Sequence, residues 1–552
     1  METTPLSSMF VDSEVGELRA VVVHSPGVAH AHIMPEHIEA QLALKEFALR
    51  RLRLSEPELD ALYLTDGTGQ RIRIAGGEPL QLHWRARDGM EGTLDLGGAL
   101  EHLFIENPQY VLFDDMVDAE RIEREHRDFE RVLRTAAPHT LRLAELLYDA
   151  LHQVLLEPEL RDEFFRRLEQ MSDPPERNNV RQSREYFEQH GERRFLQLLL
   201  SGRDHLGHYV MHPLPNLLFT RDLAAQVGNT LVLSSAAKPA RGRESVLAWL
   251  VFTRHPLFAE LAASGQLRHV DMLARRNAHP LPHRVALEGG DLLMLGNGTL
   301  MIGTGERTTI EGAIELARDL WTPRDGVPAH RGIERIILVQ ILHSRASMHL
   351  DTIFTLAWQR GANVEAMVYG PYLQDGGYGE LTAWELTPDL VAGASGRETL
   401  SPADLPPLKA TKLDELLARC GLQMTPMFCG QPTSPSRPGG HWDNPDEVFI
   451  GRLPHALNAR REQWTDGANL FALAPGIVLT YSRNYHSIEE MARCGYQVID
   501  PESFCRNSRY LLQSAVSGRD ASKYVVAIGG SELCRGRGGP RCMTLPLWRE
   551  PL

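Results

Sequence analysis

A unit that recurs along the chain limits its fold more than any other feature. In each copy a polar loop that carries an acid leads into a tight apolar hairpin, and a helix follows. The copies are EGGDLLMLGNGTLMIG (288–303), DGANLFALAPGIVLTY (466–481) and FTRDLAAQVGNTLVLS (219–234), and LRAVVVHSPG (18–27) supplies the strand of a fourth. Such repeats predict a pseudo-symmetric ring of small β/α modules, with the loop of every module at one central mouth.

Turn and capping signals place the hairpins and helices of these units. Gly-Asn-Gly (296–298) and Pro-Gly (475–476) each lie between two apolar runs, and both predict hairpin turns. The capping-box spacing of Ser or Thr three residues before Glu occurs at Thr308–Glu311 and Ser487–Glu490. We therefore expect a helix to begin at each of these two sites.

Other stretches interrupt the recurrence and suggest how the chain is divided. The stretch 118–205 is rich in Leu, Glu and Arg with helical spacing, and 36–107 starts helix-like and continues with strand-like runs such as RIRIA and QLHWRAR. We predict that the ring comprises 1–35, 108–117 and 206–552, with an insertion at 36–107, a helical subdomain at 118–205 and a loop insertion at about 425–460.

Composition restricts the partners and the compartment. The net charge of −14 argues against nucleic acid and anionic membranes as partners, since both require clustered positive charge. The first residues, METTPLSSMF, have no signal-peptide pattern, and no uncharged apolar run approaches the roughly 20 residues of a membrane span. The 6 cysteines form no CxxC pair, which favours reduced thiols and a cytoplasmic location.

Acidic and histidine residues in the loops are candidates for chemistry. His349 and Asp351 are two residues apart, which puts both side chains on one face of an extended segment. Two glycines separate Glu288 from Asp291, and Asp222 precedes another hairpin. Each motif alone also fits a structural role: a polar pair at a strand end, a turn before a hairpin, or a cap.

A glycine-rich loop near the C-terminus carries the candidate nucleophile, Cys542. The loop also contains Arg535, Arg537 and Arg541, and nearby positive charge lowers a thiol pKa and favours the thiolate. A buried structural cysteine is the alternative, but the polar, glycine-rich flank argues against a core position. The glycines do not have the spacing of a dinucleotide-binding loop.

Together these segments resemble the arginine deiminase family of guanidine-modifying, pentein-fold enzymes. The resemblance covers most of the chain in family order. It rests on VDSEVGELRAVVVHSPG (11–27), VLFDD (111–115), LPNLLFTRD (214–222), PAR (239–241), EGGD (288–291), IGTGERT (302–308), MHLDT (348–352), REQWTDGANLFALAPGIVLTYSRN (461–484) and GSELCRGRGGPRCMTLPL (530–547).

The resemblance implies an α/β fold, a five-bladed pseudo-symmetric β/α propeller (pentein) with an inserted helical subdomain. It implies that Cys542 is the nucleophile, that His349 protonates the leaving ammonia and then activates water, and that Glu288 orients His349. Asp222 and Asp351 would hold the guanidinium nitrogens, because a planar cation with five donors suits carboxylates on two sides. No metal or cofactor is expected.

The matched positions also indicate a substrate with a carboxylate. The residues that the resemblance assigns to substrate binding are Asn216, Phe219, Arg241, Asp291, Arg307, Arg537 and Gly538. Two of the arginines would face the carboxylate of L-arginine, which agmatine lacks, and the phenylalanine would pack on the alkyl chain. The expected reaction converts L-arginine to L-citrulline and ammonia through a covalent thiouronium-type intermediate.

Three alternatives remain on the same scaffold: an amidinotransferase, an arginine dihydrolase and a non-catalytic arginine-binding protein. A cysteine protease would need a local signature that the chain lacks. The chain departs from the family in its length and in Cys534, which stands where the motif has glycine. A small-molecule partner is expected, and the prediction allows a homo-oligomer.

Overall fold

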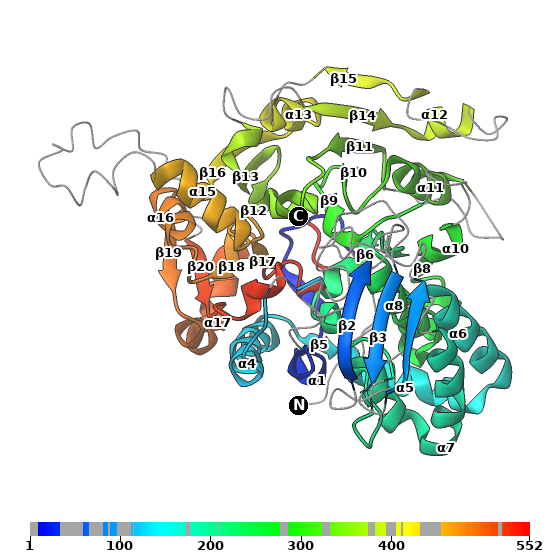
Figure 1. Ribbon diagram of the computed structural model, residues 1–552. Coiled ribbons are helices and arrows are strands. Elements are labelled where there is room, and N and C mark those ends of the chain that lie inside the picture. The colour runs from blue at the N-terminus through cyan, green and yellow to red at the C-terminus, as the bar shows by residue number, and fades with distance from the viewer. Residues whose placement is uncertain are drawn as a thin grey trace, which may run out of the picture.

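Hairpins that are each extended by a parallel strand build most of the fold in the computed structural model (Figure 1). Over the described residues the chain is a mixed α/β protein with six sheets. The structure describes residues 9–33, 59–65, 81–86, 89–95, 112–113, 115–172, 177–208, 210–276, 285–322, 332–373, 381–393, 404–409, 412–430, 454–516 and 522–552.

The first sheet joins the two ends of the chain. Its central strand β1 (Leu18–Val23) pairs antiparallel with β21 (Leu545–Arg549) and parallel with β5 (His139–Arg142). Helix α4 (Ala119–Ala136) packs on this sheet and on α17 (Pro501–Val516). The strand predicted within LRAVVVHSPG (18–27) is confirmed as β1.

The second sheet has a hairpin in the segment where the recurrence predicts one. Strands β6 (Ala224–Val227) and β7 (Thr230–Leu233) are antiparallel, and β8 (Arg268–Asp271) lies parallel to β7. Three helices accompany these strands: α8 (Gly242–Arg254), α9 (Pro256–Ala263) and α10 (Met272–Arg275).

The third sheet contains the predicted Gly-Asn-Gly turn. It joins β9 (Leu292–Met294) to β10 (Thr299–Thr304), and Gly296, Asn297 and Gly298 all have positive φ angles of 78°, 44° and 71°. The sheet continues through three strands toward the upper edge in Figure 1: β11 (Arg335–Gln340), β14 (Thr382–Leu386) and β15 (Pro407–Lys409). Its helices are α11 (Ile310–Trp321) and α12 (Pro388–Gly393).

Two further sheets repeat the arrangement of a hairpin with a parallel strand. One contains β12 (Phe354–Arg360), β13 (Asn363–Val368) and β16 (Gln423–Phe428). The other contains β17 (Phe471–Ala474), β18 (Ile477–Tyr481), β20 (Lys523–Ile528) and β19 (Tyr496–Ile499). The predicted Pro-Gly turn is confirmed, because β17 and β18 are antiparallel and Gly476 has a φ of 81°. The helices here are α13 (Leu413–Arg419), α15 (Pro454–Trp464) and α16 (Tyr485–Arg493).

The two predicted capping boxes do not form. Helix α11 begins after Thr309, whose side chain accepts a hydrogen bond from the Gly312 N–H at 3.1 Å. The Thr308 hydroxyl instead accepts from the backbone N–H of Glu288 at 3.2 Å. Ser487 lies inside α16 and donates to Glu462 at 2.7 Å. In both cases a residue at least 20 positions away in the sequence binds the hydroxyl that the local pattern assigns to a cap.

The stretch predicted as a helical subdomain divides into two parts. In its first part, α4 packs on the first sheet and β5 pairs with β1 in that sheet. The stretch 118–205 is therefore not helical throughout. The remainder forms α5 (Leu143–Leu156), α6 (Pro158–Met171) and α7 (Arg177–Ser201), which pack around buried phenylalanines and against α8. α1 (Gly27–Ala31) contacts α7.

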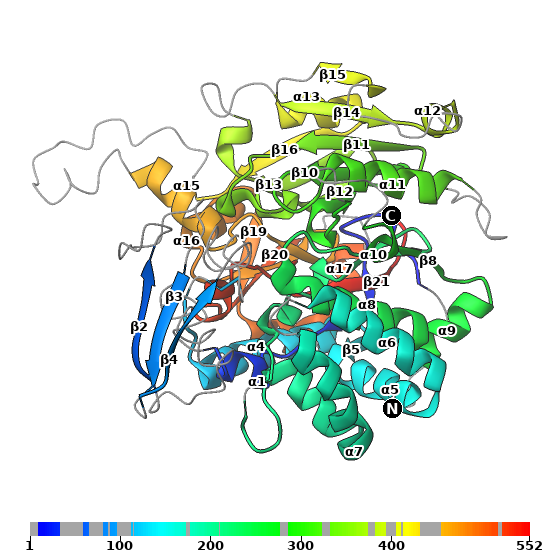
Figure 2. The same ribbon diagram turned by 45° about the vertical axis from the view of Figure 1, so that its right-hand side comes forward.

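The predicted insertions are described in part. Strands β2 (Leu59–Thr65), β3 (Gln81–Ala86) and β4 (Glu91–Asp95) form an antiparallel sheet that lies at the periphery in Figure 2. The strand-like run QLHWRAR is thereby confirmed over β3, whereas RIRIA and the helix-like segment before it lie outside the described residues. The end of β16 and the start of α15 fall within the predicted loop insertion at about 425–460, and 431–453 lies outside the described residues.

Within the described ranges, no single helix has the length and apolar composition of a membrane span. The segment Pro239–Arg254 passes such a test only together with Pro256–Ala263, and the two are bent by 57°.

Candidate active site

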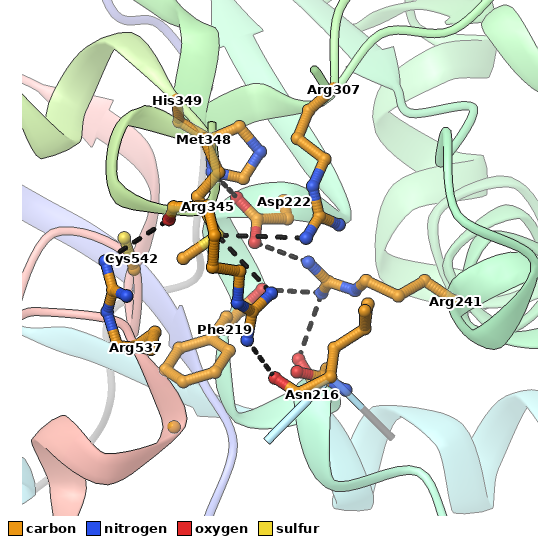
Figure 3. Close-up of a pocket in the computed structure, with 12 residues that line it drawn as sticks. Asn216, Phe219, Asp222, Arg241, Arg307, Arg345, Met348, His349, Arg537 and Cys542 are labelled. Carbon is orange, nitrogen blue, oxygen red and sulfur yellow. Dashed lines mark hydrogen bonds and ion pairs between the residues drawn. The ribbon is translucent and has the colours of Figure 1, made fainter. Parts of the chain in front are cut away.

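A pocket opens where loops of several modules meet (Figure 3). The loops with Asp222, His349 and Cys542 lie before hairpins or strands. Arg241 and Arg307 lie before the helices α8 and α11. Short 3₁₀ helices at Thr220–Asp222 and Leu350–Thr352 bring polar residues to it. The pocket is lined by Leu112, Asn216, Phe219, Asp222, Arg241, Arg307, Arg345, Met348, His349, Gly536, Arg537 and Cys542.

His349 lies between two carboxylates. Its Nε2 is 2.9 Å from Glu288 Oε2, and its Nδ1 is 3.7 Å from Asp222 Oδ1. Gly290 is required here, since a Cβ atom would lie 2.8 Å from the imidazole ring and 2.9 Å from Asp222. The segment from His349 to Asp351 turns into a 3₁₀ helix, which corrects the prediction that it is extended.

Charge pairing in this cluster outweighs the cost of burial. Burial lowers the pKa of His349, but the Asp222 charge and the hydrogen bond with Glu288 raise that pKa to about 10. Burial opposes ionisation of Glu288, yet the hydrogen bond with His349 and the Arg307 charge lower its pKa to about 2. At neutral pH the imidazole of His349 is therefore protonated and able to donate a proton.

Cys542 faces the same pocket and is buried. Its Sγ lies 3.6 Å and 3.8 Å from the two carboxylate oxygens of Asp351 and 3.2 Å from Asn469 Nδ2. Burial, followed by the negative charges of Asp351 and Asp222, raises the pKa of the thiol well above its ordinary value. These effects favour the neutral thiol over the thiolate.

The predicted effect of the neighbouring arginines on this thiol is wrong. Arg541 pairs with Glu14 at 3.0 Å and with Asp351 at 2.7 Å, so its charge is directed to carboxylates. The Arg537 guanidinium carbon lies 3.5 Å from the centre of the Trp464 ring. The expectation that a polar flank keeps Cys542 out of the core is also wrong, since 3% of the residue is exposed.

Arg541 nevertheless limits the negative charge beside the sulfur. Because it neutralises one oxygen of Asp351, that carboxylate presents less net charge to Cys542. Burial raises the energy of an unpaired acid, and this ion pair removes part of that cost. The residue immediately before the nucleophile thus holds the Asp351 carboxylate in an ion pair close to the thiol.

Arg241 is occupied by acids in this structure. It lies 2.5 Å from Asp222, 2.7 Å from Glu244 and 3.8 Å from Glu288, and it donates to the Asn216 carbonyl at 3.0 Å. Within the described ranges, Asp222, Glu288 and His349 also have the spacing of a metal-binding group. The Arg241 guanidinium already supplies positive charge there and His349 is protonated, so the donor set does not fit a metal ion.

Among the buried polar atoms that line the pocket, the acceptor Asp222 Oδ1 and the donor Arg307 Nε have no hydrogen-bond partner in the described part of the chain. Arg307 Nε lies 3.8 Å from Glu306. Arg307 is 2% exposed, and Figure 3 shows it entering the pocket with Arg241 on the side away from Cys542. Unpaired buried groups are costly, so a ligand that carries both a donor and an acceptor fits this pocket.

Sequence comparisons place the chain among known enzymes. The family profile described as arginine deiminase matches residues 109–387 and 447–549. The chain is 30% identical over 477 residues to an arginine deiminase of Mycobacterium marinum, covering 83% of this chain and 94% of that protein. It is 28% identical over 473 residues to one of Bacillus cereus, covering 83% and 95%. This chain belongs to the arginine deiminase family.

Solved structures resemble this arginine deiminase family member more distantly. An amidinotransferase of saxitoxin biosynthesis from Microseira wollei has a TM-score of 0.39 and 10% identity, covering 99% of this chain and 98% of that one. A dimethylarginine dimethylaminohydrolase has a TM-score of 0.33 and 13% identity, covering 79% and 94%. Similarity at this level does not define the fold or the activity.

The structure of this arginine deiminase family member brings most of the predicted residues to the pocket. Phe219 lines it and stacks on Phe113 at 6.3 Å between ring centres. Gly538 lies beneath Phe219, since a Cβ atom there would be 2.3 Å from its ring. Asp291 lies outside the lining and accepts from the Leu350 N–H at 2.8 Å, so this placement indicates a structural role rather than substrate contact.

Sequence reasoning missed several residues of the site. Arg345 lines the pocket but carries no pattern that distinguishes it in the sequence. Leu112 and Met348 also line it, and although they lie in the matched segments VLFDD and MHLDT, the sequence analysis gave them no role. Arg345 donates to the Leu112 carbonyl at 2.7 Å and so ties the loop before His349 to the segment before α4. Asn469 stands within a stretch that resembles the family, but its contact with Cys542 depends on packing between modules.

Proposed function

We propose that this protein is an arginine deiminase that hydrolyses L-arginine to L-citrulline and ammonia. One observation carries the proposal: a single pocket holds a thiol, an unmatched carboxylate oxygen of Asp222 and an unmatched guanidinium N–H of Arg307. A substrate with a cation at the reacting end and an anion at the other end satisfies both. Free L-arginine has this charge pattern, and its guanidinium carbon is the electrophile that a thiolate attacks.

Binding of the substrate changes the charge beside the sulfur. Asp222 and Asp351 both raise the pKa of Cys542, and the guanidinium that they hold neutralises this effect. The thiol proton then leaves to solvent, and the thiolate remains next to the guanidinium carbon. Substrate binding therefore creates the nucleophile only when there is something for it to attack.

In the first chemical step a C–S bond forms and the electron pair of the C=N bond moves onto nitrogen. The His349 imidazolium donates its proton to the departing nitrogen, the C–N bond breaks and ammonia leaves. A cationic thiouronium-type group stays on Cys542. The pKa of about 10 supports His349 as the proton donor, and Glu288 at 2.9 Å holds its ring in place.

In the second step the neutral His349 takes a proton from water as the water oxygen attacks the same carbon. The C–S bond then breaks, and its electron pair returns to sulfur as thiolate. The hydroxyl proton leaves to solvent, so that the sum is arginine cation plus water giving citrulline and ammonium. The reaction class is hydrolysis of a C–N bond in a linear amidine.

The other end of the substrate is assigned to Arg307, and Asn216 lies beside Arg241. Arg241 contributes less to the carboxylate than the sequence suggests, because Asp222 and Glu244 already take its guanidinium. Arg537 and Gly538 lie in the loop before the nucleophile, and Phe219 faces the alkyl chain. This arrangement favours L-arginine over agmatine, which has no group for Arg307.

For the architecture we propose the five-module β/α propeller of the pentein fold. Support comes from five sheets that each contain an antiparallel pair and a parallel pair, around loops that converge on one pocket. The β2–β4 sheet and α5–α7 are additions to this ring. The domain boundaries, the cytoplasmic location and the small-molecule partner remain predictions.

The test is incubation of the purified protein with L-arginine and no amine acceptor, followed by mass spectrometry and an ammonia assay. We expect citrulline with one ammonia per arginine. Ornithine with two ammonia would instead identify a dihydrolase, and turnover only after adding an amine would identify an amidinotransferase. Cys542→Ala should abolish turnover yet bind arginine, whereas the matched control Cys505→Ala should retain activity.

A further inference from the structure

Asn469 makes four hydrogen bonds around the nucleophile. Its Nδ2 donates to Cys542 Sγ at 3.2 Å and to the Asp351 carbonyl at 3.0 Å. Its Oδ1 accepts from the backbone N–H groups of Arg541 at 3.0 Å and Cys542 at 3.1 Å. The residue is fully buried and lies just before β17, in a different module from Asp351.

These contacts fix which end of the amide faces the sulfur. An amide oxygen accepts at most two hydrogen bonds and an amide nitrogen donates two, so all four bonding sites are used. With the amide reversed, its NH₂ group would face two backbone N–H donors. The N–H of Asn469 must therefore point at Sγ, and this conclusion follows from the network rather than from the assignment of one atom.

The sulfur otherwise lies in surroundings that oppose its ionisation. Burial and the charges of Asp351, Asp222 and Asp466 raise the thiol pKa, whereas the hydrogen bond from the Gly539 backbone lowers it. The neighbouring arginines bind carboxylates or aromatic rings, as described above. The neutral N–H donors of Asn469 and Gly539 thus favour negative charge at this sulfur.

We propose that Asn469 Nδ2 and the Gly539 N–H form a binding site for the Cys542 thiolate, equivalent for sulfur to an oxyanion hole, and that Asn469 is a catalytic residue. This proposal rests on the proposed function, which makes Cys542 the nucleophile. The hole acts twice in the reaction. It stabilises the attacking sulfur before the C–S bond forms, and it stabilises the departing sulfur when that bond breaks and its electron pair returns.

The glycine on the other side supports this geometry. A Cβ atom on Gly539 would lie 2.6 Å from Asn469 Oδ1 and 2.7 Å from its Cβ. Real Cβ atoms do not approach other atoms so closely, so any side chain here would displace the amide. Absence of a side chain lets the loop close on Asn469 and brings both N–H donors to one sulfur.

The test reads the sulfur directly and needs no substrate. Wild type, Asn469→Asp and Asn469→Ala are alkylated with iodoacetamide across a range of pH. Mass spectrometry measures the modification of Cys542 separately from that of the other cysteines. The Asp variant keeps the shape and the acceptor oxygen but loses both donors. We expect its alkylation midpoint to rise by about one to two pH units, and its rate near neutrality to fall roughly 10- to 100-fold.

The matched control is Asn297→Asp. The Asn297 side chain donates to the Cys420 carbonyl at 2.9 Å in the β9–β10 turn, far from this loop, and the variant should alkylate Cys542 as wild type does. Arginine binding, measured in a Cys542→Ala background, should change little with Asn469→Ala. Wild-type alkylation midpoints in both Asn469 variants would overturn the proposal, even if turnover falls.

Gly539→Ala supplies a second route if an Asn469 variant does not fold. It moves the amide away from Sγ without altering Asn469, and should also shift the midpoint upward, whereas an unchanged midpoint would contradict the proposal. Alkylation also separates this inference from the proposed function. A protein that leaves arginine unchanged but shows the midpoint shifts would retain the thiolate site and lose the deiminase assignment.

Discussion

Replacing Glu14 with glutamine should destabilise the fold through the ion pair behind the nucleophile. Glu14 is buried and accepts two hydrogen bonds from Arg541, from Nε at 3.0 Å and from Nη2 at 3.1 Å. It also accepts from the Met294 N–H at 3.2 Å. Arg541 in turn holds Asp351 at 2.7 Å. The pair therefore fastens the first segment of the chain to the loop that carries Cys542.

The magnitude follows from the acidity of Glu14. Burial opposes its ionisation, but the Arg541 and Arg221 charges lower its pKa from 4.5 to about 2. At about 1.4 kcal/mol for each tenfold change, this difference stabilises the folded state by about 3 kcal/mol. Removing one partner of a buried ion pair costs about 3–5 kcal/mol, which agrees. We expect Glu14→Gln to lower the free energy of unfolding by about 3 kcal/mol near neutral pH.

The pH dependence has a definite sign. Because the pKa of Glu14 is lower in the folded state, its contribution is complete above about 4.5 and is lost as the pH falls toward about 2. Urea unfolding of wild type and Glu14→Gln, followed by circular dichroism, should therefore show a gap that is full near neutrality and shrinks in acid. A gap that persists unchanged in acid would refute the reasoning.

A neighbouring glutamate provides the control. Glu17 lies in the same segment, pairs with the partly exposed Arg19 at 3.1 Å and has a pKa raised by burial. Its replacement by glutamine should change the free energy of unfolding by at most about 1 kcal/mol. Equal losses in the two variants would mean that Glu14 contributes no more than an ordinary surface acid.

Two further predictions concern the pocket. Arg307→Leu should raise KM roughly 10- to 100-fold for L-arginine and much less for agmatine, because its buried Nε is unmatched until a carboxylate arrives, and equal effects in steady-state kinetics would contradict that role. Its control is Arg318→Leu, which removes an arginine that lies in α11 outside the pocket and pairs with Glu315 at 2.6 Å. Gly538→Ala should weaken arginine binding and destabilise the protein by about 1–3 kcal/mol, since the new Cβ would meet the Phe219 ring at 2.3 Å. Calorimetry measures the binding and urea unfolding measures the stability. Neither should change in the control Gly393→Ala, where nothing lies within 4 Å of the new Cβ.

Local backbone requirements explain why the hairpins could be predicted from the sequence. The turn at Gly296–Gly298 needs three successive residues at positive φ, and Gly476 needs the same conformation between β17 and β18. Glycine and asparagine tolerate this conformation, so the pattern alone indicates the turn. The arrangement of the modules in space has no such local signal.

The capping boxes failed for the opposite reason. The Thr308 and Ser487 hydroxyls have the right spacing for caps, but Glu288 and Glu462, distant in sequence, bind them. The strand β5 was missed because four residues between two amphipathic helices carry little pattern of their own, and pairing with β1 defines them. Tertiary contacts thus decided the outcome where the local preference was weak.

The ionisation states of the site show where sequence reasoning reached its limit. Family resemblance pointed to Cys542, but its flanking arginines suggested a thiolate, and the structure turns Arg541 toward Glu14 across 527 residues of sequence. Burial and nearby acids then decide the charge of the sulfur, and neither can be read from neighbours in the chain.

The two carboxylate-binding arginines illustrate how part of this could have been foreseen. Arg241 is followed three residues later by Glu244 at the start of α8, and residues at this spacing on a helix contact each other. A guanidinium that already has a carboxylate partner attracts a second one less strongly. The Arg307 guanidinium lies 3.8 Å from Glu306 and 3.8 Å from the Met348 sulfur, and neither is a close ion pair, so it retains the stronger attraction for a substrate carboxylate. The spacing of Arg241 and Glu244 therefore ranks Arg307 above Arg241 as the residue that binds the substrate carboxylate. The steady-state kinetics of Arg307→Leu test the role of Arg307.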